Sequence, residues 1–251
     1  MSNRELVSII VPVYNAERCI ADTILCIKRQ IYDNWELLLC DDDSTDDSLR
    51  IMQEYASDRI RILPRGDYEK GAAHARNRGI DNANGRYIAF LDADDYWTED
   101  KLSKQIEYMT EKDCAFCFTG YEFADENLRP TGQIVKVPET ITYRQALGNT
   151  TIFTSTVIFD MDKLSKDDIR MPAVKSEDTA TWWKVLKKIQ YGYGFDQVLT
   201  LYRRQSGTLS SNKFEAIARI WNLYRNVEKL PLVSSAYYFV LWAFRAVLRR
   251  I

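Results

Sequence analysis

An alternation of two hydrophobic periods over residues 7–123 constrains the fold more than any other feature of this sequence. Short apolar runs rich in β-branched residues are typical of buried strands, and apolar residues spaced three and four apart are typical of amphipathic helices. The predicted strands are 7–13, 35–40, 59–63, 86–91 and 114–123; the predicted helices are 16–30 (with Ile20, Ile24, Ile27 and Ile31 as its apolar side), 44–55, 71–83 and a segment carrying Leu102, Ile106 and Met109. This order predicts an α/β fold with a mainly parallel, doubly wound sheet.

Two polar patterns predict where helices begin. Ser44 and Asp47 have the spacing of a capping box, and Thr98 is a candidate cap for the helix that follows it.

The second half is less regular. Strands are predicted at 135–137, 151–159 and 191–204, and helices at 176–190, 213–228 and 231–250. With no internal repeat and no long linker, we expect one domain over residues 1–212 followed by a C-terminal helical tail, 213–251.

Composition excludes several functional classes. The net charge of −2 argues against a dedicated nucleic-acid binder, which usually has a basic excess. The single histidine, His74, excludes every site built from two or more histidines, and we expect it at the surface or in packing.

Five cysteines, an odd number in a chain long enough to need no disulfides, favour a reduced compartment, and we interpret the Cys114/Cys117 pair as small buried side chains. We find no signal-peptide pattern and no apolar run long enough to span a bilayer, so we expect a cytoplasmic protein.

Acidic side chains follow two of the predicted strands, at residues 41–46 and 92–95. In open α/β sheets ligands bind at the carboxyl ends of strands, so both groups would lie at the binding edge. The segment after the first strand, 12–15, has no glycine, and neither GxGxxG nor the P-loop pattern occurs. Clustered carboxylates suit Mg²⁺ or Mn²⁺ with a diphosphate. The structural alternative, acids that cap the following helices, accounts for Asp46 and Asp47 better than for Asp92 and Asp94.

Three segments together resemble the family 2 glycosyltransferases of GT-A fold: VSIIVPVYN, ELLLCDDDSTDDS and GAAHARNRGIDNANGRYIAFLDADDYW. The resemblance covers residues 7 to about 120, with weaker matches at 176–178 and 201–210. It implies a Rossmann-like GT-A sheet with flanking helices, a donor-binding half at 1–120 and an acceptor half at 121–212.

The resemblance also implies residue roles on the donor side. Pro12 and Tyr14 would line the pocket for the nucleobase and ribose. Asp42 would accept a hydrogen bond from uracil N3–H, which makes the donor a UDP-sugar. Arg76 would brace the acidic cluster or the donor, and Asp92 would lie near the ribose.

The remaining roles concern the metal and the acceptor. Asp94 would bind Mn²⁺ or Mg²⁺, and Asp178 matches the position of the catalytic base. Glu177 and Trp182 would lie on the acceptor side, although a tryptophan at this helical position can equally be part of the core.

The sequence departs from the family pattern twice. Asp43 stands where the family usually has glycine, so the turn after the second strand carries an extra charge. Gln205 follows Tyr202-Arg203-Arg204, where the family often has histidine, so that loop offers no histidine ligand to a metal.

The implied function is inverting transfer of a sugar from a UDP-sugar to a glycan or lipid-linked glycan in bacterial surface polysaccharide synthesis. One alternative is a haloacid-dehalogenase-like phosphohydrolase with Asp92 as nucleophile and Asp94 as acid/base, although Tyr96 stands where that signature has threonine or valine. Another is a non-catalytic sugar-nucleotide-binding module.

The C-terminal segment 231–251 allows two interpretations. It is apolar and aromatic, ends in arginines, and is too short to span a bilayer. It could lie in the membrane interface at the inner face of the plasma membrane and bring the enzyme to a lipid-linked acceptor. Alternatively, it packs on the domain or in a dimer interface.

Overall fold

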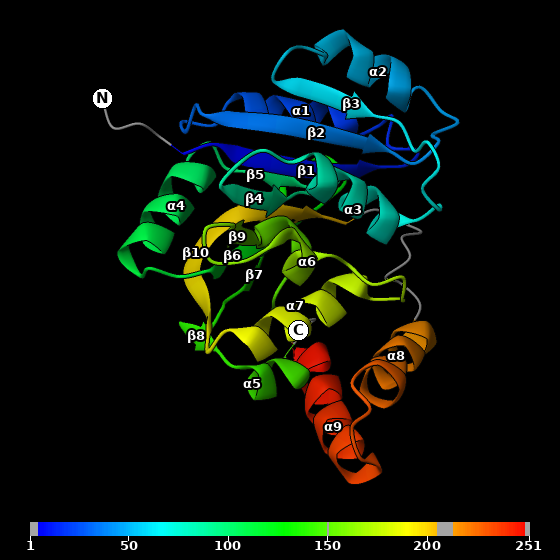
Figure 1. The fold of residues 1–251 in the computed structure, drawn as a ribbon, viewed down its shortest axis with the longest axis vertical. Helices are drawn as coiled ribbons and strands as arrows, with labels where there is room; N and C mark the ends of the chain where they lie inside the picture. The colour runs from blue at the N-terminus through cyan, green and yellow to red at the C-terminus, as the bar shows by residue number, and fades with distance from the viewer. Residues whose placement is uncertain (1–4, 150, 205–212, 249–251) are drawn as a thin grey trace.

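A mixed β-sheet with helices on both faces forms the body of the protein (Figure 1). The structure is a computed structural model that describes residues 5–149, 151–204 and 213–248. Its strands are β1 Val7–Val13, β2 Trp35–Asp41, β3 Ile60–Leu63, β4 Tyr87–Phe90, β5 Tyr96–Trp97, β6 Phe116–Ala124, β7 Pro130–Val135, β8 Thr140–Ile141, β9 Ile158–Asp160 and β10 Gly192–Arg203. Its helices are α1 Ile20–Lys28, α2 Ser48–Tyr55, α3 Ala72–Asn82, α4 Lys101–Glu111, α5 Tyr143–Leu147, α6 Lys166–Ile169, α7 Glu177–Lys188, α8 Lys213–Asn222 and α9 Leu232–Leu248, with a 3₁₀ turn at Thr154–Thr156 and a π-helical turn at Leu223–Val227.

The strand order is β3-β2-β1-β4-β9-β6-β10-β5, with β7 on β6 and β8 on β10. Strands β3, β2, β1 and β4 are mutually parallel, and β6 is parallel to β10. The prediction of a mainly parallel α/β sheet is therefore confirmed. The sequence did not indicate that β9, a late strand, lies antiparallel between β4 and β6.

Several local predictions are wrong. Of the strand predicted at 151–159, only its last residues belong to β9, because a 3₁₀ turn occupies Thr154–Thr156. Helix α2 begins at Ser48 without a side-chain cap, and the Ser44 hydroxyl instead accepts a hydrogen bond from the Asn15 backbone. Helix α4 begins at Lys101, beyond Thr98. Ile31 lies past the end of α1 and is exposed.

Strand alternation divides the core into two layers. Along β1, Val7, Ile9 and Val11 belong to the apolar cluster shared with α1 and α4. Ile10 belongs to the cluster shared with α3 and α7 on the other face. The period of two in the sequence thus becomes one helical layer on each side of the sheet.

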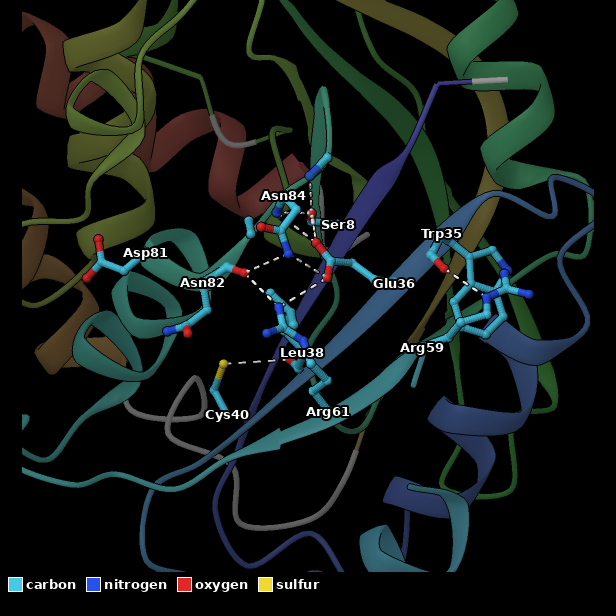
Figure 2. Close-up of polar contacts among 12 residues, drawn as sticks. Ser8, Trp35, Glu36, Leu38, Cys40, Arg59, Arg61, Asp81, Asn82 and Asn84 are labelled. Carbon is cyan, nitrogen blue, oxygen red and sulfur yellow. Dashed lines mark hydrogen bonds and ion pairs between the residues drawn. The ribbon is translucent and has the colours of Figure 1, made fainter. Parts of the chain in front are cut away.

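A buried carboxylate ties the strands together at the edge where β1 and β2 begin (Figure 2). Glu36 on β2 accepts hydrogen bonds from the Ser8 hydroxyl at 2.6 Å and the Asn84 backbone N–H at 2.7 Å, and pairs with Arg61 at 3.1 Å. Burial raises the pKa of Glu36, but these hydrogen bonds and Arg61 outweigh that effect and leave the pKa below its ordinary value. Glu36 therefore fixes β1, β3 and the turn between α3 and β4.

Helix α3 lies unusually close to the sheet because of Gly79. A Cβ at this position would come within 3.0 Å of the Cys40 sulfur and closer still to Ile10. Glycine at 79 therefore sets the distance between α3 and strands β1 and β2.

The C-terminal helices lie at the end of the molecule opposite β3 (Figure 1). Trp183 of α7 stacks on Tyr224 of the π-helical turn, with ring centroids 5.4 Å apart. Arg245 of α9 donates to the Gly148 carbonyl at 2.8 Å. Within the described ranges, no helix combines the length and apolarity that a membrane crossing requires.

The close approach at Gly79 predicts that Gly79→Ala is destabilising. Alanine favours a helix over glycine by about 1 kcal/mol, but overpacking a core typically costs about 1–3 kcal/mol. Because the added Cβ would lie well within 3.0 Å of Ile10, the overpacking cost should fall at the upper end of that range, and we expect a net loss of about 2 kcal/mol in the free energy of unfolding, measured by urea denaturation. Gln53→Ala on the exposed side of α2 is the control and should change stability by less than about 0.5 kcal/mol. A neutral Gly79→Ala variant would contradict the close packing of α3.

Candidate active site

A cleft of about 990 Å³ opens where β1, β2 and β4 end. Its walls come from the loops that the sequence singled out. They include Pro12, Tyr14, Asp42, Asp92 and Asp94, together with Lys70, Gly71, Phe153 and Tyr202. Four of the five predicted donor-side residues and the predicted metal ligand therefore line one cavity; the fifth, Arg76, lies beside it.

Asp42 presents a free acceptor to this cleft. Its side chain is buried, and its Oδ2 accepts a hydrogen bond from the Gly71 backbone N–H at 2.9 Å. Its Oδ1 is also buried but has no hydrogen-bond partner among the described residues. A buried carboxylate oxygen without a donor is costly, so this atom is suited to a donor from a ligand.

The turn after β2 adopts a left-handed conformation at Asp43, the position where we expected a departure from glycine. Asp43 has φ +58°, in the left-handed region that glycine adopts without strain and aspartate tolerates. Its carboxylate pairs with Arg65 at 2.5 Å, which compensates the additional charge.

The loop after β1 forms the outer wall of the cleft. The Tyr14 ring is 49% exposed, and the Lys70 ammonium lies 3.9 Å from its centroid. Asn15, with φ +50°, accepts from the Thr45 backbone N–H at 2.8 Å, so the loops after β1 and β2 are held together. An aromatic face beside a cation at this position suits stacking on a base and contact with an anionic ligand.

The turn after β4 is held by a serine that the sequence reading missed. The Ser155 hydroxyl donates to Asp95 Oδ2 at 2.5 Å and accepts from the Asp92 backbone N–H at 3.0 Å. Asp95 is fully buried, and burial raises its pKa well above the ordinary value. Ser155 and Asp95 thus fix the position of Asp92 and Asp94. In the sequence, only Asp95, the fourth residue of the DADD segment, pointed to a buried contact here. Ser155 was missed because its segment, Thr154–Thr156, resembles part of a strand.

Asp94, the predicted metal ligand, lines the cleft close to Asp92. Burial, and secondarily the charge of Asp92, raise its pKa to about 6. Nearby cationic charge would reverse this effect, since it favours the ionised form. The described ranges contain no group of three or more side chains that could hold a metal. Oxygen ligands such as Asp94 fit Mg²⁺ or Mn²⁺ when the substrate diphosphate and water complete the coordination.

Arg76 of α3 joins two parts of the site that are distant in sequence. Its buried guanidinium donates to Asp92 Oδ1 at 2.6 Å and to Glu177 Oε1 at 2.8 Å. Burial alone would lower the pKa of the Arg76 guanidinium. The charges of Asp92 and Glu177 outweigh burial and raise this pKa above its ordinary value, so the guanidinium stays charged. We expected Arg76 to brace the acidic cluster or the donor; it lies against Asp92 of that cluster, and its role toward the donor stays a prediction.

A second cavity of about 630 Å³ adjoins the first and shares Ala72, Asp92 and Phe153 with it. The start of α7 lines it through Glu177 and Asp178. Residues of α8 and α9 line it as well, including Arg219, Ile220, Trp242 and Ala246.

Asp178 is oriented by local hydrogen bonds. Its Oδ2 accepts from the Thr154 hydroxyl at 3.1 Å and its Oδ1 from the Thr179 backbone N–H at 2.6 Å. Burial raises the pKa of its neighbour Glu177, against the charge of Arg76. Ser176, just before α7, has φ +60°, a conformation that L-residues rarely adopt and that occurs often at functional sites.

Trp182 borders the second cavity but is only 2% exposed. Its ring packs among Phe90, Phe116 and Phe159, with centroids 5.6–6.4 Å away. This placement makes it a core residue with little ring surface for sugar stacking, and its acceptor-side role stays a prediction.

Most of the other residues considered in the sequence analysis lie apart from both cavities or outside the described ranges. His74 is 3.4 Å from Glu69, and neither cavity includes it. The five cysteines are buried and form no disulfide with one another, and Cys19 lines the larger cleft. Arg203 is buried and pairs with Asp22 at 2.9 Å. Gln205 and the rest of the 205–210 match lie outside the described residues.

The double ion pair of Arg76 predicts a pH-dependent defect in Arg76→Met. Removing one partner of a buried pair typically costs about 3–5 kcal/mol. Without Arg76, the pKa of Glu177 rises further above its unfolded value. A carboxyl group whose pKa is higher in the folded than in the unfolded protein lowers the free energy of unfolding at pH values above its unfolded pKa. This loss of stability becomes smaller as the pH falls toward the unfolded pKa. The thermal stability deficit against wild type should therefore be larger at about pH 8 than at about pH 5. Arg50→Met, which breaks exposed pairs, is the control and should show a small, pH-independent change.

Comparison with known proteins agrees with this geometry. The sequence model described as Glycosyl transferase family 2 matches residues 8–165. TuaG of Bacillus subtilis (strain 168), named as a teichuronic acid biosynthesis glycosyltransferase, is 40% identical over 251 residues, covering 99% of this chain and 98% of its own. WfgD of Escherichia coli, named as a UDP-Glc:α-D-GlcNAc-diphosphoundecaprenol β-1,3-glucosyltransferase, is 38% identical over 237 residues, covering 92% of this chain and 90% of its own.

Solved structures share the fold. TarS of S. aureus in complex with UDP-GlcNAc superposes with a TM-score of 0.70 at 21% identity, over 95% of this chain and 72% of that one. The mannosyltransferase PcManGT of Pyrobaculum calidifontis, in complex with GDP-Man and Mn²⁺, superposes with a TM-score of 0.69 at 17% identity, over 99% of this chain and 72% of that one. The family match and the relatives select the transferase over the phosphohydrolase and the binding module. The chain belongs to the family 2 glycosyltransferases and has their GT-A fold.

Proposed function

We propose that the protein transfers a sugar from a UDP-sugar, with inversion, to a hydroxyl of a glycan carried on a lipid diphosphate. One observation carries the proposal: two cavities meet at Asp92, with the Asp42 acceptor in one and the Asp178 carboxylate in the other. The names of WfgD and TuaG support a lipid-diphosphate acceptor and a place in bacterial surface polysaccharide synthesis.

The larger cleft is the proposed donor site. The unpartnered Asp42 Oδ1 accepts from uracil N3–H, and the base lies against Pro12 and Tyr14. Asp92 is oriented by Arg76 and faces the ribose. Asp94 holds Mn²⁺ or Mg²⁺; when bound, the ion supplies positive charge that stabilises the diphosphate leaving group.

The second cavity is the proposed acceptor site. Asp178 takes the proton from the acceptor hydroxyl as that oxygen attacks C1 of the donor sugar. The bond from C1 to the diphosphate oxygen breaks on the opposite face, so the anomeric centre inverts. An α-linked donor then gives a β-glycoside, the linkage in the name of WfgD. Arg76 keeps Glu177 beside Asp178, where its carboxylate can contact the acceptor.

Asp178→Asn tests the catalytic base. The change keeps the shape and removes the basicity, and losing a general base typically costs about 10²–10⁴-fold in rate. We expect transfer to fall by that factor while the affinity for UDP stays at the wild-type value in calorimetry. Asp167→Asn, an exposed carboxylate on α6, is the control and should leave both unchanged. Near-wild-type turnover in Asp178→Asn would move the base to Glu177, and loss of UDP binding would place Asp178 in the donor site.

Asp94→Asn tests the metal ligand. If Asp94 holds the ion, Mn²⁺ should strengthen UDP binding by the wild-type protein and should lose that effect in the variant, because an amide oxygen carries no charge to attract the cation. Titration calorimetry with UDP, with and without Mn²⁺, measures this. Asp58→Asn at the exposed turn before β3 is the matched control. An equal metal effect in Asp94→Asn and wild type would reject the assignment.

A further inference from the structure

Helix α9 carries an apolar stripe on its outer face. The stripe consists of Val233, Tyr237, Val240, Phe244 and Val247, spaced four and three residues apart and each 60–81% exposed. This spacing places all five on one side of the helix. Large apolar side chains in a continuous row are unusual at the surface of a soluble monomer and mark an interaction surface.

The opposite face of α9 is fixed to the protein. Trp242 and Ala246 line the second cavity, and Leu241 contacts Gly148. The Arg245 guanidinium donates to the Gly148 carbonyl. One helix thus forms a wall of the proposed acceptor site with one side and presents the apolar stripe with the other. Figure 1 shows α9 at the outer end of the molecule, beyond α5 and α7.

The charge of this segment selects the kind of partner. Residues 229–251 contain Lys229, Arg245, Arg249 and Arg250 and no carboxylate, whereas the whole chain has a net charge of −2. An apolar helix face in a segment with only positive charges complements a surface of anionic lipid phosphates. A second copy of α9 offers no complementary negative charge to this segment, because an isologous interface presents the same patch on both subunits.

We propose that the stripe lies in the interface of an anionic phospholipid membrane, which holds the second cavity, on the other side of α9, about one helix diameter (roughly 10 Å) from the lipid headgroups. The 17 residues of α9 extend about 25 Å, short of the hydrocarbon core of about 30 Å, so the helix lies on the membrane and does not cross it. Tyr237 suits the headgroup level, where tyrosine is enriched. This inference rests on the proposed function, since a lipid-diphosphate acceptor presents its sugar at that level.

The double variant Val240→Glu/Phe244→Glu tests the membrane contact. Wild type should co-sediment with vesicles of phosphatidylglycerol and phosphatidylcholine, and less with phosphatidylcholine alone or at high salt. Because burial of each large apolar side chain contributes to binding, the variant should lose at least about tenfold in partitioning. Ile134→Glu, at an exposed apolar position on β7 away from the stripe, is the control and should bind as wild type. Val233→Glu is a milder second variant, and thermal unfolding shows whether each remains folded.

Two acceptors separate this inference from the proposed function. With an acceptor embedded in vesicles, the double variant should lose transfer; with a water-soluble, short-chain lipid diphosphate sugar, it should keep wild-type transfer. Equal vesicle binding by variant and wild type, or none by wild type, overturns the membrane contact. A wild-type dimer that becomes monomeric in the variant, without vesicle binding, also overturns it and assigns the stripe to self-association. Wild-type vesicle binding with no transfer to either acceptor leaves the membrane contact intact and rejects the proposed function.

Discussion

The Arg76 guanidinium joins the acidic turn at Asp92 to Glu177, which lies 101 positions beyond Arg76 in the chain, and the geometry of both cavities depends on these contacts. Taking this charge out of water is favourable only with good partners, which Asp92 and Glu177 provide. The same contacts place a positive charge between two carboxylates that would otherwise repel each other. The position of Arg76 depends in turn on α3, which Gly79 lets approach the sheet and which the Glu36 network anchors at its far end.

Three of the residues with left-handed backbone conformations lie around this site: Asn15, Asp43 and Ser176. Each is adjacent in sequence to a residue that lines one of the two cavities. Such conformations persist only where surrounding contacts fix them, and here Thr45 holds Asn15 and Arg65 holds Asp43. The rim of the active site is therefore rigid before any substrate arrives, which lowers the entropic cost of binding.

Most residues predicted for the donor side come together in one cleft because their sequence signals are local. The hydrophobic periods located β1, β2, β4 and α3, and the carboxyl ends of parallel strands must meet at one edge. The acceptor side depends on contacts between distant segments, for which no local pattern exists. Nothing near Arg76 indicates Glu177 as a partner, and the apolar spacing of TIFTSTVIF concealed a 3₁₀ turn whose Ser155 orients the acidic turn. Burial of Trp182 likewise follows from packing against three strands and not from the period of its helix.

The placement of β9 has a consequence for synthesis of the chain on the ribosome. Strand β9 follows β6 in sequence but lies between β4 and β6, which do not pair with each other. A nascent chain that ends after β6 therefore exposes one unpaired edge of β4, although all residues of that strand have been made. Unpaired edges in incomplete domains invite pairing with other chains, which chaperones counter. The half of the sheet that carries the acidic turns is complete only when residue 160 has emerged, and the family match ends just beyond it, at residue 165.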